Sequence, residues 1–264
     1  MVDGDVFPGT GAEGELDPGA EIEEEPLPSA SGRLRPLAWI TLLGIAWGQS
    51  SLLIGTLLSP GPETVGQAIS IELTGLLTVA YVLAARAWMP HLGGHPRRNA
   101  LALGMLNAAI VEVLLIAGRA LSGGEGVGFY PDLAIDLVLV LPWYAGVLWL
   151  FLRAHDRWRF SVPAVLLLGG LYEAGADWLL RGVLLGGIPI GPAIVLLVVF
   201  QFWQFVVVYS SIVLPPALLV GAAPLPERSA GSPWADAVVP LAWLLPYSFY
   251  VVAVLSLLAG PGGG

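Results

Sequence analysis

The chain has 264 residues, of which 56% are hydrophobic and only 12% are charged, and its formal net charge is −9. This composition is far too apolar for a soluble domain, and apolar runs of about 20 residues recur, the length that crosses the hydrocarbon of a bilayer. There is no cysteine, which excludes disulfides, thiolate metal sites and cysteine nucleophiles. All 11 basic residues are arginine, so the chain cannot form the lysine Schiff base that binds retinal.

The acidic charge is confined to the N-terminal region. Residues 1–32 contain nine carboxylates and no arginine, whereas 11 acids balance 11 arginines from residue 33 onward. The N-terminal segment is rich in glycine and proline and has few large apolar side chains, so it cannot bury enough surface to fold. We therefore predict a disordered, acidic cytosolic tail over residues 1–32, with a docking arm for a basic partner as the alternative. Residues 33–264 are predicted to form a transmembrane domain.

Seven apolar runs predict an all-α integral membrane protein, a polytopic bundle of seven transmembrane helices. The sixth run is expected to end or break at Pro215-Pro216, because proline cannot donate the backbone hydrogen bond that continues a helix. The predicted spans are, in chain order, residues 37–58, 67–88, 100–119, 131–152, 162–180, 192–213 and 237–259.

Small and helix-breaking residues inside the spans predict how the helices contact one another. Gly44 and Gly48 in the first span are four residues apart, a spacing that lets another helix approach closely. We interpret them as a helix-packing contact rather than a ligand contact. Pro142 lies in the middle of the fourth span, where it frees a backbone carbonyl that a neighbouring group or water must satisfy.

The three histidines are all expected at one end of the bundle. His91 and His95 have the spacing of a helical metal site, but the glycines between them and the following Pro96 argue against a helix there. His155 is expected in a later loop at the same end. We predict solvated interfacial histidines, with a metal site as the alternative.

The distribution of arginines predicts the orientation. If the N-terminus is cytosolic, nine arginines fall at the inner ends of the spans and two at the outer ends, a strong positive-inside bias. Seven spans then place the C-terminus outside the cell. The nine predicted inner arginines are Arg33, Arg35, Arg86, Arg97, Arg98, Arg153, Arg157, Arg159 and Arg228, and the two outer ones are Arg119 and Arg181.

The strongest candidate for a functional site lies in the fifth predicted span. Residues 169–187, GGLYEAGADWLLRGVLLGG, are apolar but include Glu173, Asp177 and Arg181. Their i, i+4, i+8 spacing places the three side chains on one stripe of a helix. A carboxylate inside hydrocarbon is costly unless it is paired, hydrated or protonated, so such a residue indicates a functional site.

Further acids are predicted at a similar depth in the outer half of the bundle. At a rise of about 1.5 Å per residue, Glu72 and Glu112 share the level of Glu173, while Asp136 and Asp177 lie about one turn above. If these faces converge, they form an outward-opening acidic pocket. The predicted proton- or cation-binding residues are Glu72, Glu112, Asp136, Glu173 and Asp177, the predicted charge partners are Arg119 and Arg181, and Gln201 and Gln204 are predicted to line a pore or a packing contact.

A purely structural role for these acids is the alternative. Asp177 and Arg181 would then be an ordinary ion pair one helical turn apart. Glu112 and Glu173 would be protonated acids that form hydrogen bonds between helices.

Two short motifs resemble those of membrane enzymes. Residues 176–182, ADWLLRG, resemble the Glu-Glu-x-x-x-Arg-Gly motif of the CAAX-protease and bacteriocin-processing family, which would make Asp177 a catalytic acid and Arg181 its partner. Alanine replaces the first glutamate of that motif, and no histidine follows in a later predicted span, where the family has two. Asp132 and Asp136 resemble the Asp-rich magnesium-diphosphate motifs of membrane prenyltransferases, which face the cytosol, whereas this pair is predicted outside.

Three classes of function follow from these patterns. The first is proton- or cation-coupled transport or permeation by a multi-pass protein of the cell (plasma) membrane. The second is a membrane-embedded, metal-dependent enzyme that processes a peptide or a lipid, and the third is a structural or accessory membrane subunit. Oxygen ligands of this kind would suit a divalent cation as cofactor. The expected partners are the lipid bilayer and either a second copy of the chain or a larger membrane complex, and nothing indicates nucleic acid.

Overall fold

The computed structural model describes residues 31–123, 132–177, 195, 197–222 and 231–259. Within these ranges the chain is helical and forms no strand. Six helical segments there are long and apolar enough to cross a membrane, and helix α6 (Val162–Gly175) is apolar but shorter. The structure thus supports the helical membrane bundle that the apolar runs predict. Most of the predicted acidic tail, residues 1–30, lies outside the described residues.

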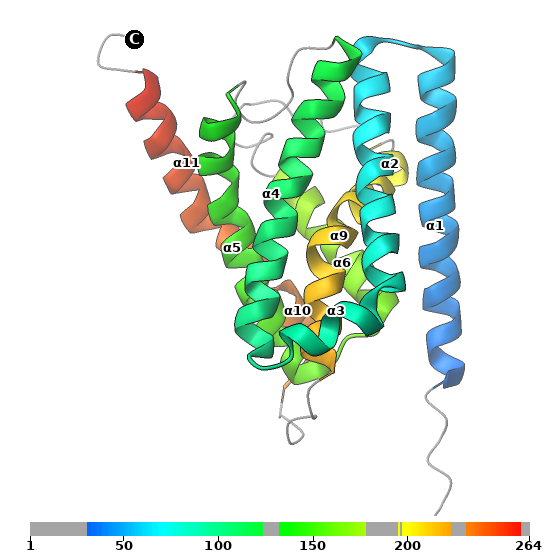
Figure 1. Ribbon diagram of the computed structural model, residues 1–264, viewed down its shortest axis with the longest axis vertical. Coiled ribbons are helices and arrows are strands. Elements are labelled where there is room, and N and C mark those ends of the chain that lie inside the picture. Colours follow the sequence, from blue (N-terminus) through cyan, green and yellow to red (C-terminus); the bar gives the residue numbers. More distant parts are fainter. Residues whose placement is uncertain (1–30, 124–131, 178–194, 196, 223–230, 260–264) are drawn as a thin grey trace, which may run out of the picture.

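Long helices and a few short ones follow one another along the described parts of the chain (Figure 1). Helix α1 (Ser31–Leu58) precedes α2 (Pro62–Leu83), the short α3 (Ala85–Leu92), α4 (Pro96–Ser122) and α5 (Leu133–Trp158). After α6 come the π-helical turn η2 (Leu197–Gln201) and α9 (Phe202–Gly221). The last segment joins α10 (Pro233–Val238), the 3-10 turn η3 (Val239–Trp243) and α11 (Leu244–Ala259). The start of α1 and the end of α11 lie at opposite ends of the bundle (Figure 1).

Helix α9 is the centre of the bundle. Nearly all of its residues from Val206 to Val220 are buried, and α1, α2, α4, α5 and α6 all contact it. Helix α6 approaches α9 closely because glycines face it. A methyl group added to Gly170 would come within 3.1 Å of the Val206 backbone nitrogen, and one on Gly169 within 2.8 Å of a Val213 methyl. Such close contacts between backbones are how small residues stabilise helix pairs in membranes.

The GxxxG segment of α1 packs against α9 as the sequence predicts. Gly44 and Gly48 are buried, and a methyl group added to either one would clash with Trp203. Trp47 on the same helix donates its indole hydrogen to the Val199 carbonyl in η2, at 3.1 Å. These contacts attach α1 to the bundle.

The prediction that Pro215-Pro216 ends or breaks the sixth span is wrong, because α9 continues through both prolines to Gly221. A proline at position 215 leaves the carbonyl of Ser211, four residues earlier, without its helical donor. The Asn107 side chain of α4 donates to that carbonyl at 2.7 Å. The helix can therefore continue, because a neighbouring helix supplies the missing hydrogen bond.

The same compensation occurs at Pro142 in α5. The carbonyl that this proline frees belongs to Val138, and the Tyr250 hydroxyl of α11 donates to it at 2.7 Å. Trp243 in η3 donates its indole hydrogen to the carbonyl of Pro142 itself, at 3.0 Å. The last helical segment of the chain is thereby tied to the proline region of α5.

Other predicted boundaries also differ from the structure. The second span was predicted over residues 67–88, but α2 starts at Pro62 and a break at Ala84 separates it from α3. The predicted basic loop after the fourth span is helical as far as Trp158. His155 is therefore a buried helical residue rather than a solvated one. It lies 3.1 Å from the Ala217 carbonyl and stacks on Phe151 with ring centroids 5.7 Å apart.

Candidate functional site

A polar cavity of about 250 Å³ lies between α2, α4, α6 and α9. It is lined by two of the predicted acids, Glu173 and Asp177, by the predicted charge partner Arg119, and by Gln201 and Gln204. Arg119 is in the last turn of α4. Because α4 starts at the arginine-rich end of the bundle, the cavity lies toward the opposite end.

Irregular backbone places two of these side chains at the cavity. Helix α6 ends at Gly175, and the next two residues, Ala176 and Asp177, have π-helical backbone. Gln201 closes the second π-helical turn, η2, directly before α9. Turns of this kind insert an extra residue per turn and occur often at functional sites. Here they turn Asp177 and Gln201 toward the same space.

The glutamines connect the helices across the cavity. Gln67 from the second turn of α2 also lines it and donates an amide hydrogen to the Gln204 carbonyl oxygen at 3.4 Å. Amides can both donate and accept hydrogen bonds. The cavity wall therefore offers donors and acceptors to a hydrated occupant as well as carboxylates.

A second pair of carboxyl groups lies buried beside this cavity. Glu112 of α4 is 6% exposed and Asp136 of α5 is fully buried. The Tyr144 hydroxyl donates to Glu112 at 2.6 Å, and Asp136 is near enough to Glu112 to interact with it electrostatically. Arg119 is near enough to Glu112 to attract it electrostatically, and it also lines the cavity with Glu173 and Asp177. The same arginine is therefore close to both groups of acids.

Tyr209 links the two groups of acids. Its ring centroid lies 5.6 Å from that of Tyr144, and it interacts electrostatically with Glu173 and Glu112. Its hydroxyl is buried and forms no hydrogen bond of good geometry with a described residue. Glu173, Tyr209, Tyr144 and Glu112 are thus neighbouring ionisable side chains between the cavity and the interior.

The remaining predicted site residues lie elsewhere. Glu72 does not line the cavity but accepts a hydrogen bond from the Gln49 amide of α1, at 3.2 Å. It therefore faces α1 and does not join the other acids. Arg181 lies outside the described residues. Of the pair that resembles a prenyltransferase motif, Asp132 caps the start of α5 by accepting from the Ala134 and Ile135 backbone nitrogens, so it has a structural role.

Three residues of this region were not predicted as site residues, namely Gln67, Tyr144 and Tyr209. The only signal available in the sequence was a hydrogen-bonding side chain inside an apolar run. That signal does not tell which face of a helix the side chain is on.

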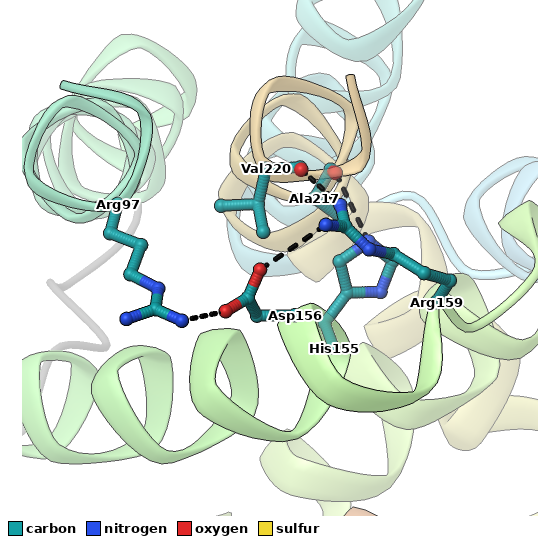
Figure 2. Close-up of polar contacts among 6 residues, drawn as sticks. All are labelled: Arg97, His155, Asp156, Arg159, Ala217 and Val220. Carbon is teal, nitrogen blue, oxygen red and sulfur yellow. Dashed lines mark hydrogen bonds and ion pairs between the residues drawn. The ribbon is translucent and has the colours of Figure 1, made fainter. Parts of the chain in front are cut away.

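The arginine-rich end of the bundle holds a separate polar cluster (Figure 2). The Asp156 carboxylate of α5 binds Arg97 of α4 through one oxygen and Arg159 through the other, the latter at 3.3 Å. Arg159 also donates to the Val220 carbonyl of α9. This cluster ties α4, α5 and α9 together.

A metal site has no support in the described part of the chain. No group of three or more His, Asp or Glu side chains there could hold a metal ion. His155 is packed in the interior, whereas His91 lies in the last turn of α3 and the exposed His95 precedes α4.

Comparisons with models of known protein families, with curated proteins and with solved structures find no match to this chain. The seven-residue resemblance to the CAAX-protease family is therefore not extended by a family match. The fold is a helical, apolar bundle compatible with a membrane protein, and its function has to be inferred from its own residues.

Proposed function

We propose that this protein mediates proton-coupled transport or permeation across the cell membrane, and that the cavity lined by Glu173 and Asp177 is where protons enter from outside. The observation that supports the proposal is that Tyr209 and Tyr144 lie between this cavity and the buried acids Glu112 and Asp136. Ionisable groups inside a membrane bundle are typical of ion pathways and proton relays.

The charge count supports a site that takes up positive charge. Glu112, Asp136, Glu173 and Asp177 are four carboxyl groups, against the guanidinium groups of Arg119 and, outside the described residues, at most that of Arg181. Full ionisation would leave net negative charge in an apolar interior, which is costly. Protons or a small cation would neutralise it.

The size of the cavity favours a small occupant. A space of about 250 Å³ holds several water molecules or a hydrated small ion. It is below the range of about 300–1,000 Å³ that is typical of pockets that enclose a drug-sized ligand. The transport hypothesis is therefore preferred to the hypothesis of an enzyme acting on such substrates in this cavity.

We further propose that the chain crosses the plasma membrane seven times, that the segment beginning with α6 is the additional crossing, and that the N-terminus lies in the cytosol. The arginine-rich end of the bundle would then face the cytosol, as the positive-inside rule requires. The cysteine-free chain allows a clean test with a membrane-impermeant thiol reagent. Ser59→Cys, between α1 and α2, should react from outside only, and Gly94→Cys, between α3 and α4, from the cytosolic side only. The reverse pattern would refute the orientation.

The transport proposal is tested by reconstituting the protein in liposomes that contain a pH-sensitive dye. An inward-directed proton gradient should acidify the lumen, and Glu173→Gln should slow this acidification at least about tenfold. Glu63→Gln is the matched control, because Glu63 is an exposed acid in the first turn of α2 outside the cavity.

Thermal melts of the same variants separate a functional acid from a structural one. A functional Glu173 predicts little loss of stability in Glu173→Gln, because glutamine resembles the neutral acid. Large losses of stability in both Glu173→Gln and Arg119→Gln would show a structural ion pair, if the proton flux of Glu173→Gln also equals that of the wild type and of the Glu63→Gln control. The interpretation as an accessory subunit would then take first place.

A further inference from the structure

Two adjacent cavities lie between α4 and α5 at the arginine-rich end of the bundle, well away from the cavity of Glu173. The first, of about 480 Å³, is lined by His95, Pro96, Arg97, Arg98, Asp156 and Val220. The second, of about 490 Å³, is lined by Arg97, Leu101, Trp149, Leu152 and Arg153. Arg97 lines both, so the two cavities adjoin at its side chain, and together they are called the groove.

The groove carries an excess of positive charge. Three arginines line it, and the single carboxylate among the lining residues, that of Asp156, already binds Arg97 and Arg159. Arg98 and Arg153 are exposed, and neither has a carboxylate partner among the described residues. The groove is therefore suited to an anionic group.

The Arg97 side chain is 78% exposed and contacts Asp156 at the edge of the groove. Asp156 in turn contacts Arg159, which donates to the carbonyl of Val220 (Figure 2). A guanidinium group has five N–H donors in a planar fork, so Arg97 can bind a phosphate while its contact with Asp156 is kept.

The wall of the groove becomes apolar toward the middle of the bundle. Leu101 lies one turn deeper along α4 than Arg97, and Trp149 lies one turn deeper along α5 than Arg153. The Trp149 side chain is 55% exposed although it lies inside an apolar helix. A ligand that follows the groove meets cationic groups first and apolar side chains next, which is the order of groups in a phospholipid.

We propose that this groove binds an anionic glycerophospholipid, with the phosphate headgroup at Arg97, Arg98 and Arg153 and an acyl chain against Leu101 and Trp149. Basic pockets between helices at the cytosolic side of a membrane bind anionic headgroups, and that leaflet carries the anionic lipids. A free phosphate ion would use the arginines alone and leave the apolar wall without a function. The lipid is therefore the occupant that the whole groove fits.

The test is native mass spectrometry of the 264-residue protein in neutral detergent, titrated with phosphatidylglycerol or with phosphatidylcholine. The first phosphatidylglycerol should bind at least about tenfold more tightly than phosphatidylcholine. Replacing both Arg98 and Arg153 by glutamine should weaken it about thirtyfold, at the usual contribution of one basic residue to anionic-lipid binding. Arg86→Gln is the matched control, because Arg86 is an exposed arginine of α3 that lines neither cavity.

The acyl chain has its own control. Trp149→Ala should weaken phosphatidylglycerol binding severalfold, and glycerol phosphate at the same concentration should not displace the lipid from the wild type. Three outcomes would each overturn the proposal. The double glutamine variant would bind phosphatidylglycerol as tightly as the wild type, or Arg86→Gln would lose as much affinity as the double variant, or glycerol phosphate would displace the lipid. The melting temperature of every variant verifies folding, and Arg98→Lys with Arg153→Lys, which keeps the charge, should retain most of the affinity.

Discussion

The hydrogen bond from Asn107 to the Ser211 carbonyl makes a quantitative prediction about the proline pair in α9. Asn107→Ala removes this bond and leaves the Tyr81 hydroxyl, which donates to the Asn107 side-chain oxygen at 2.7 Å, without its acceptor. Hydrogen bonds between membrane helices contribute about 0.6 kcal/mol on average and up to about 1.7, and a buried group left without a partner costs about 1–3 kcal/mol. We expect Asn107→Ala to lower the free energy of unfolding by about 2–3 kcal/mol.

The proline makes this cost dependent on a second residue. In Pro215→Ala, the new backbone N–H at position 215 can donate to the Ser211 carbonyl through the ordinary helical bond. Asn107→Ala should then cost about 1 kcal/mol less than it does in the wild type. The loss of the Tyr81 contact is common to both backgrounds and cancels in a double-mutant cycle.

The cycle is measured by reversible unfolding in a mixture of mild detergent and dodecyl sulfate, followed by circular dichroism. Pro216→Ala is the matched control, because proline 216 frees the carbonyl of Ile212, to which Asn107 does not donate. Asn107→Ala and Pro216→Ala should be additive. Additivity within about 0.5 kcal/mol for Asn107→Ala and Pro215→Ala as well would refute the idea that Asn107 compensates for the first proline.

Three further predictions concern packing, the buried acids and the tail. Gly48→Ala should destabilise the protein by more than about 1 kcal/mol, because its methyl group would lie 2.6 Å from Trp203. Gly55→Ala, which has no atom within 4 Å of the added methyl group, should be neutral or up to about 1 kcal/mol more stable. A thermal melt compares the two variants. Tyr144→Phe should cost about 1–3 kcal/mol in the same unfolding assay, because Glu112 loses its donor. Deletion of residues 2–30 should leave the melting temperature unchanged, and a drop of several degrees would show that this segment packs on the bundle.

Much of the helical arrangement could be predicted from the sequence because it depends on local features. Apolar runs of sufficient length give the long helices, and the spacing of Gly44 and Gly48 indicates that α1 packs closely on another helix, although it does not identify α9 as that helix. The continuation of α9 through two prolines could not be predicted in this way. It depends on a donor, Asn107, that is 104 residues away in the sequence.

The candidate site shows the same limit. The stripe of Glu173 and Asp177 was visible in the sequence, and both residues line one cavity with Gln201 and Gln204. Depth counted along the helices placed Glu72 with them, but depth does not determine which face of α2 carries the side chain. In the structure that face is turned toward Gln49 of α1.

The two compensated prolines also bear on the order in which the protein can be completed during synthesis. Asn107 is translated before Pro215, so the partner of α9 is already in the membrane when α9 emerges from the ribosome. Tyr250 is translated more than 100 residues after Pro142. The carbonyl that this proline frees therefore has no Tyr250 donor until the last helix has been synthesised. In nascent chains that stop before α11, we expect the middle of α5 to lack this hydrogen bond and to be sensitive to proteases. We expect membrane quality control to recognise these incomplete chains.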